Sequence, residues 1–159
     1  MTINVEANAV PLIVEMSNIE KVVGTSLGPG PWMTIEQDRI DRFAEATGDH
    51  QWIHVDPERS AAGPFGRTIA HGYLTLSLVP LLMNGIFDVT GRSSGVNYGV
   101  DKVRFVTPVP EGARVRMSGS VLTASPRAGG IQYRLGLAIE LEGSEKPAMV
   151  GEFIALAFP

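Results

Sequence analysis

Residues 69–87 form a nearly continuous apolar run (IAHGYLTLSLVPLLMNGIF) that is expected to be helical. A helix that is apolar on almost every side must be buried all round. Pro80 lies inside this segment and is expected to bend the helix, because proline removes one backbone hydrogen bond. One sheet face covers only part of a helix, so the fold needs a sheet that curves around this segment and further cover on the far side.

The second half of the chain alternates apolar and polar residues, as half-buried strands do. The alternation is strictest over residues 131–141, and residues 100–106, 113–123 and 148–158 also read as strands. Turns rich in proline and glycine separate them. We therefore predict an antiparallel sheet with one dry and one wetter face. The predicted fold class is α+β, with a curved antiparallel sheet wrapped around a long central helix.

The first half of the chain is predicted to hold shorter helices. Residues 17–24 begin with the S-x-x-E spacing of a capping box and end at glycine, which predicts a helix of about two turns. Residues 34–48 begin with a second capping box and continue as an amphipathic helix. Residues 49–55 are predicted as loop, and an Asp-Pro pair opens a short turn at 56–63. Residues 1–16 have no clear period and read as an extension or an edge strand.

Composition excludes several classes of protein. The length of 159 residues suits one domain, placed at 17–159 after an N-terminal extension of unknown role at 1–16. Without cysteine, the chain has no disulfides, no cysteine-ligated metal and no cysteine nucleophile. A net charge of −4 argues against a nucleic-acid partner. The apolar run is too short for a membrane span and no secretory signal is evident, so we expect a cytoplasmic protein.

All three histidines, His50, His54 and His71, lie within one stretch that also contains Asp49. Asp49 and His54 occupy two points of one irregular segment, where their side chains could converge. A carboxylate and an imidazole are what positioned proton transfer to or from water requires at neutral pH. The alternative is that these residues cap turns or lie on the surface, and spacing alone does not decide between the two.

Gly72 opens the apolar helix, where the first N–H groups have no partner in the helix. Its N–H could stabilise a carbonyl oxygen that becomes an enolate, as in an oxyanion hole. Alternatively, this glycine only permits close packing of the helix on the sheet. His71, which precedes it, is more simply a satisfied structural histidine than a ligand or a base.

No metal site is predicted. His50 and His54 have the spacing of a helical zinc motif, but Gln51 replaces the glutamate that such a motif requires. Downstream, the cations Arg92, Lys102 and Arg104 flank residues 97–99. They are interpreted as a solvated strand face or as an anchor for an anionic group.

Three segments together resemble a known family. Residues 43–56 (FAEATGDHQWIHVD) and 63–72 (GPFGRTIAHG) are similar to the hydratase motif of the MaoC-like dehydratase family. Residues 97–105 (NYGVDKVRF) resemble its (R)-specific enoyl-CoA hydratases, the subgroup with nodulation protein N-like and mycobacterial members. The resemblance extends from about residue 17 to the C-terminus. It implies a hot-dog fold and a homodimer with the acyl tunnel at or near the subunit interface.

The resemblance also implies roles for individual residues. The catalytic pair of the family falls on Asp49 and His54, and its oxyanion donor falls on the Gly72 N–H. Some members carry a serine nine residues after the motif histidine, where this chain has Pro80; that role is either missing or taken by Ser77. The candidate substrate-binding residues are His71, Ser77, Asn97, Tyr98 and Arg104. No cofactor is implied, since coenzyme A is part of the substrate.

The function implied is that of an (R)-specific enoyl-CoA hydratase, which adds water reversibly to trans-2-enoyl-CoA and gives (R)-3-hydroxyacyl-CoA. One alternative is a hot-dog acyl-CoA thioesterase, which would place an acid on or near the central helix; residues 72–87 contain none. Another is a non-catalytic acyl-thioester binding module, which has no evident need for both Asp49 and His54. Acyl chain length and the choice of coenzyme A or a carrier protein are not decided by the sequence.

Overall fold

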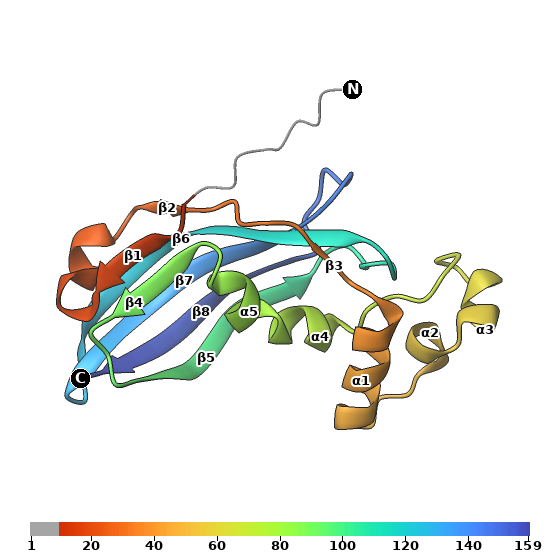
Figure 1. Cartoon of the computed structure of the whole chain (residues 1–159), viewed down its shortest axis with the longest axis horizontal. Helices are drawn as coiled ribbons and strands as arrows, with labels where there is room; N and C mark the ends of the chain where they lie inside the picture. The colour runs from red at the N-terminus through yellow and green to blue at the C-terminus, as the bar shows by residue number, and fades with distance from the viewer. Residues whose placement is uncertain (1–9) are drawn as a thin grey trace.

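The computed structural model describes residues 10–159, so most of the extension expected at 1–16 lies outside the described residues. A short parallel pair of strands, β1 and β4, lies beside a larger antiparallel sheet (Figure 1). The elements in chain order are β1 (Leu12–Glu15), the 3-10 helix η1 (Met16–Val22), β2 (Ser26–Leu27), β3 (Met33–Thr34), α1 (Gln37–Thr47), α2 (Trp52–Val55), α3 (Pro57–Ala61), α4 (Gly72–Ser77), α5 (Val79–Met83), β4 (Phe87–Thr90), β5 (Ser94–Phe105), β6 (Arg114–Arg127), β7 (Gly130–Leu141) and β8 (Met149–Phe158).

The large sheet runs in the order β2-β6-β7-β8-β5, with β3 also pairing with β6, and every pairing in it is antiparallel. It curves behind α4 and α5, which lie across one of its faces (Figure 1). The predicted α+β fold with a curved antiparallel sheet is therefore confirmed. The four strands expected from alternation are all present, and β5 begins at Ser94, earlier than the residues 100–106 that were expected.

The core lies between this sheet and the two central helices. Every second residue of β7, from Tyr133 to Ile139, is buried. Leu74 and Leu82 of the central helices are buried in the same cluster. Full burial of one such side chain contributes about 1.5–3 kcal/mol, so the alternation fixes which face of the sheet meets the helices.

The central helix differs from the prediction. The expected long helix over 69–87 is two short helices, α4 and α5, that meet at Leu78. Pro80 lies in the first turn of α5, where a missing N–H costs no helical hydrogen bond. Ile69 and Ala70 are not helical because their N–H groups bond to the Ile53 and Val109 carbonyls, at 3.0 and 2.8 Å.

Both predicted capping boxes are wrong. Thr34 pairs with Arg114 across β3 and β6, so it cannot cap the next helix. The N-caps are instead Glu15 for η1 and Glu36 for α1, and neither makes a side-chain cap hydrogen bond. The predicted cap at Asp56 is present, because its carboxylate accepts a hydrogen bond from the Arg59 N–H at 3.0 Å.

Two further segments have more structure than was expected. Residues 49–55, predicted as loop, contain the single-turn helix α2. Within the predicted extension, β1 pairs in parallel with β4, so that part is an edge strand. No helix among residues 10–159 has the length and apolarity that a bilayer crossing requires.

Candidate active site

Helices α1, α2 and α3 gather at one end of the molecule, next to the start of α4 (Figure 1). Gly48 ends α1 with a φ of 78°, a left-handed conformation that suits glycine, and the chain then turns toward α2. Gln37 joins the two sides of this region: its Nε2 donates to the His54 carbonyl at 2.8 Å, and its Oε1 accepts from the Thr68 hydroxyl. These contacts hold α2 against the segment that leads into α4.

His54 is buried, with 6% of its surface exposed. Its Nδ1 lies 2.7 Å from the Ile69 carbonyl oxygen. Because a carbonyl can only accept, Nδ1 carries the proton and Nε2 keeps a free lone pair. Burial lowers the pKa of His54, and the neighbouring His71 lowers it further, while the bond to Ile69 and the Asp49 carboxylate act in the opposite direction. His54 is therefore neutral at pH 7 and can accept a proton at Nε2.

His71 lies directly against His54. The two rings stack with centroids 3.8 Å apart and an angle of 23° between their planes. Only 2% of His71 is exposed, and its Nε2–H donates to the Asp49 carbonyl oxygen at 2.9 Å. The Phe43 ring also packs against it, with centroids 4.9 Å apart. His71 thus connects the backbone of Asp49 to the ring of His54. Its Nδ1 is enclosed without a hydrogen-bond partner among the described residues, so His71 is not the fully satisfied structural histidine that the sequence favoured.

Asp49, His54 and His71 each bring one side-chain nitrogen or oxygen within 4.8 Å of the others. The segment between α1 and α4 therefore brings Asp49 and His54 together. The two nearly parallel imidazole rings are poorly arranged for a metal ion, since their lone pairs lie in the ring planes and do not converge on one point. His50 does not join this group, and its Nε2 lies 3.7 Å from Glu45.

Gly72 is the first residue of α4, so its N–H has no acceptor within the helix. A Cβ at this position would lie 2.8 Å from the Phe105 ring. The close packing of helix on sheet that the sequence left as an alternative is therefore present. It leaves the amide of Gly72 available, so packing and an oxyanion role are compatible.

A cavity of about 670 Å³ lies between the central helices and strands β5, β7 and β8. Its lining starts at Leu76, one turn after Gly72. Three candidate substrate-binding residues line it: Ser77, Asn97 and Tyr98. The Ser77 hydroxyl donates to the Tyr73 carbonyl at 2.6 Å, so its own proton is already engaged. The volume is typical of a small-molecule site.

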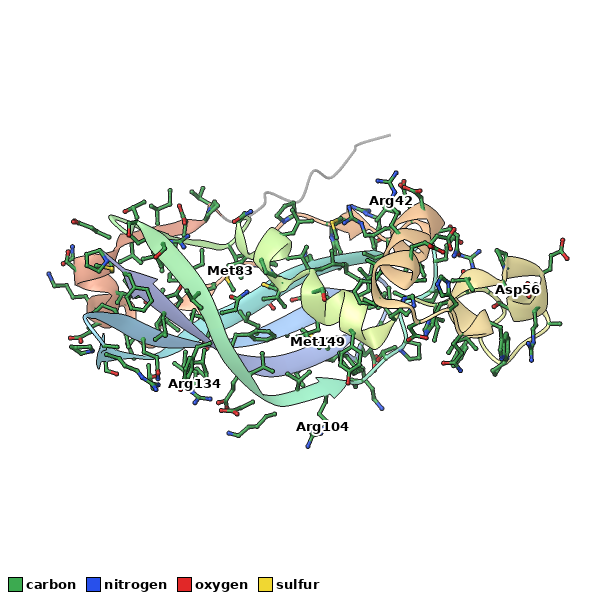
Figure 2. The ribbon with its side chains drawn as sticks, turned by 90° about the horizontal axis from the view of Figure 1, so that it is seen from below. Arg42, Asp56, Met83, Arg104, Arg134 and Met149 are labelled. Atoms are coloured by element: carbon green, nitrogen blue, oxygen red, sulfur yellow. The ribbon has the colours of Figure 1, made fainter. Side chains whose placement is uncertain are left out.

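Of the remaining candidate and cationic residues, Arg104 and Lys102 lie outside this cavity. Arg104 points away from the molecule (Figure 2) and donates to the Val103 carbonyl at 2.7 Å. Lys102 pairs with Glu152 at 2.8 Å. Arg92 lines the cavity but lies 3.5 Å from the Asp88 carboxylate. The interpretation as a solvated strand face fits Lys102 and Arg104 better than that of an anchor for an anionic group.

Sequence reasoning missed residues that matter for the site. Gln37 was interpreted as part of a capping box, yet its side-chain amide donates a hydrogen bond to the His54 carbonyl and so holds α2 in place. Thr68 was not singled out, and Tyr133 was assigned only to the dry face of a strand. No local pattern marks these residues, because their partners lie far away in the sequence.

The model of the MaoC-like domain family matches residues 18–136. The chain belongs to the MaoC-like family. This MaoC-like chain is 48% identical over 140 residues to 3-hydroxyacyl-thioester dehydratase Z of Mycobacterium tuberculosis, covering 87% of this chain and 93% of that protein. It is 41% identical over 149 residues to nodulation protein N of Rhizobium meliloti, covering 91% of each.

Solved structures agree on the fold. R-hydratase PhaJ1 from Pseudomonas aeruginosa superposes with a TM-score of 0.70 at 24% identity, covering 86% of this MaoC-like chain and 81% of the other. The family and the hot-dog fold expected from the sequence are both confirmed.

Proposed function

We propose that this MaoC-like protein is an (R)-specific enoyl-CoA hydratase, a hydro-lyase that interconverts trans-2-enoyl-CoA and (R)-3-hydroxyacyl-CoA. One observation carries the proposal: a carboxylate, Asp49, and a neutral imidazole, His54, lie within 4.8 Å of each other. The adjoining helix begins at Gly72, whose amide has no helical acceptor. The relative with 48% identity, named a 3-hydroxyacyl-thioester dehydratase, supports the same chemistry.

In the proposed hydration, one water molecule lies between Asp49 and His54. His54 Nε2 accepts a proton as the water oxygen attacks C3, and the electrons of the double bond move toward the thioester oxygen. The Gly72 N–H donates to that oxygen while it carries negative charge. The imidazolium then returns the proton to C2, and its lowered pKa favours this transfer. The Asp49 carboxylate accepts a hydrogen bond from the second hydrogen of the water and orients it.

Every step is redox-neutral and uses groups of the chain, so the proposal includes no resident cofactor. Incubation with crotonyl-CoA tests it: the enoyl absorbance should fall, and chiral analysis of the product should give the (R)-3-hydroxy thioester. Release of free thiol would indicate a thioesterase instead. Tight binding without turnover would indicate a binding module. A cytoplasmic location and the lack of a nucleic-acid partner remain predictions from the sequence.

The activity should depend on the ionisation of His54. As the pH falls through the lowered pKa of His54, Nε2 becomes protonated and kcat/KM should decline, with a midpoint below the ordinary value near 6.5. Because the unfolded chain binds this proton at a higher pH than the folded chain, the free energy of unfolding should also fall below about pH 6.5. A pH profile of crotonyl-CoA hydration measures the midpoint.

Asp49→Asn provides the control for this profile. The Asp49 carboxylate raises the pKa of His54. The variant lacks this carboxylate, so the midpoint of its pH profile should lie at lower pH, even where the rate is reduced. A midpoint above 6.5 in the unaltered protein, or a shift to higher pH in the variant, would contradict the assignment.

We further propose that the protein is a homodimer that pairs through β5. This strand is twelve residues long, lies at the edge of the sheet and, among the described strands, its backbone pairs only with β8. Val96, Tyr98 and Val100 on it are about half exposed. A long apolar edge is prone to aggregation unless it is covered, and a second copy of the strand covers it by continuing the sheet. Residues of β5 line the cavity, so the partner would also close its open side.

Light scattering after size exclusion should give a dimer at micromolar concentration. Val100→Lys should shift the protein toward monomer, because a charged side chain opposes pairing at an edge strand. An unaltered protein that remains monomeric at this concentration would exclude the dimer.

A further inference from the structure

Tyr133 lies in the cavity wall on the inward face of β7. It is 8% exposed, and its ring packs edge-on against Phe87 with centroids 6.0 Å apart. Buried tyrosine hydroxyls usually have a hydrogen-bond partner. Among residues 10–159, the Tyr133 hydroxyl has none. The Tyr133 hydroxyl is also not fully enclosed by protein. Among residues 10–159, the only fully enclosed side-chain nitrogen or oxygen without a hydrogen-bond partner is Nδ1 of His71. The hydroxyl therefore opens into the cavity.

The charged groups nearest to Tyr133 are already engaged. Arg92 donates from Nε to the Val89 carbonyl at 2.7 Å, and its Nη2 lies 3.5 Å from the Asp88 carboxylate. Burial raises the pKa of Tyr133, so its hydroxyl stays protonated at neutral pH. The Tyr133 O–H is thus a donor in the cavity wall that no described protein group accepts from.

This donor is far from Gly72, beside which the reacting carbons are proposed to lie. Phe105, which touches Gly72, pairs with Met149, whereas Tyr133 pairs with Ala155. These two positions lie six residues apart on β8, which is about 20 Å of strand. The central helices and the sheet enclose this length of strand. Met83 of α5 and Met149 of β8, both labelled in Figure 2, belong to these two layers. The wall between is largely apolar, with Leu76, Val79, Met83, Leu135, Phe153 and Ala155.

We propose that the cavity receives a long acyl chain that carries an oxygen function, a hydroxyl or a carbonyl, near its far end, and that Tyr133 donates a hydrogen bond to that oxygen. This inference rests on the proposed hydratase function and names its substrate class. A chain that ends in methyl would fill the cavity but leave the buried phenol without a partner, which costs the desolvation of that group. A polar oxygen there satisfies the phenol, and sites built to bind a substrate oxygen discriminate against analogues that lack it.

The test compares pairs of trans-2-enoyl-CoA substrates of equal length, one ending in methyl and the other in a terminal hydroxyl, from short to long. At the length that reaches Tyr133, the unaltered protein should favour the hydroxylated chain by about tenfold in kcat/KM. Tyr133→Phe removes only the hydroxyl and should bring this ratio to about one. Tyr73→Phe is the matched control and should leave the ratio unchanged, because Tyr73 is 68% exposed and is not among the residues that line the cavity.

Crotonyl-CoA separates the two proposals, since it is too short to reach Tyr133. If crotonyl-CoA is hydrated but the unaltered protein favours methyl-ended chains at every length, the inference about Tyr133 is wrong and the hydratase stands. An equal ratio in Tyr133→Phe and the unaltered protein also overturns it. If no enoyl-CoA is hydrated, the proposed function itself fails. Thermal unfolding of Tyr133→Phe should match that of the unaltered protein, because no protein hydrogen bond is lost.

Discussion

Replacing His54 with asparagine should lower kcat/KM for crotonyl-CoA hydration by about 10³-fold, while the fold is kept. The asparagine amide can still donate to the Ile69 carbonyl in place of Nδ1, 2.7 Å away in the unaltered protein. It has no group at the position of Nε2, so the proton acceptor is lost.

Asp49→Asn should lower the rate by about 10²-fold, because it removes the charge that orients the water but keeps an oxygen of similar position.

His50→Asn is the matched control for His54→Asn. His50 is a neighbouring histidine of the same segment, but its side chain is half exposed and its Nε2 lies 3.7 Å from the Glu45 carboxylate. Its replacement should leave the rate within about twofold of the unaltered protein. The rates come from the loss of enoyl absorbance, and circular dichroism checks the fold. If folded His54→Asn hydrates crotonyl-CoA at the unaltered rate, the assignment of His54 is wrong.

Replacing Gly72 with proline should lower kcat for hydration by about 10²–10³-fold relative to Gly72→Ala. Both variants add a Cβ that meets the Phe105 ring, 2.8 Å away, but only proline removes the N–H. Proline suits the first position of a helix, and His71 before it has φ −57° and ψ 139°, which a following proline favours. The comparison therefore isolates the amide from the packing at Phe105.

The rate of each Gly72 variant is measured at saturating crotonyl-CoA, so that weaker substrate binding does not obscure the chemical step. The alanine variant reports the cost of displacing Phe105. Equal kcat values for the two folded variants would show that the Gly72 amide stabilises no charge, leaving close packing as the role of this glycine.

Much of the fold could be predicted from the sequence because its signals are local. Strand alternation in 131–141 follows from the two-residue period of a pleated strand, and every second residue from Tyr133 to Ile139 is indeed buried. Asp49 and His54 belong to one short segment, so their convergence needed only a single turn of chain.

Other features depended on partners distant in sequence. Thr34 has the sequence of a helix cap, but pairing with Arg114 places it in a strand. The expected long helix is two short ones, and the first begins three residues later than expected, since the Ile69 and Ala70 amides bond to other segments. Gln37 has the sequence of a capping residue and instead links α2 to Thr68.

The sequence by itself determined that an apolar segment must be enclosed by a curved sheet, and that an acid and an imidazole occur together before it. Both follow from periodicity and composition along the chain. Only the tertiary structure decided that His54 is held neutral with Nε2 free, that His71 links it to Asp49, and that the Tyr133 hydroxyl opens into the cavity. The reason is physical: ionisation and hydrogen bonding depend on burial and on which atoms meet across the fold, and the chain brings these atoms together only when it folds.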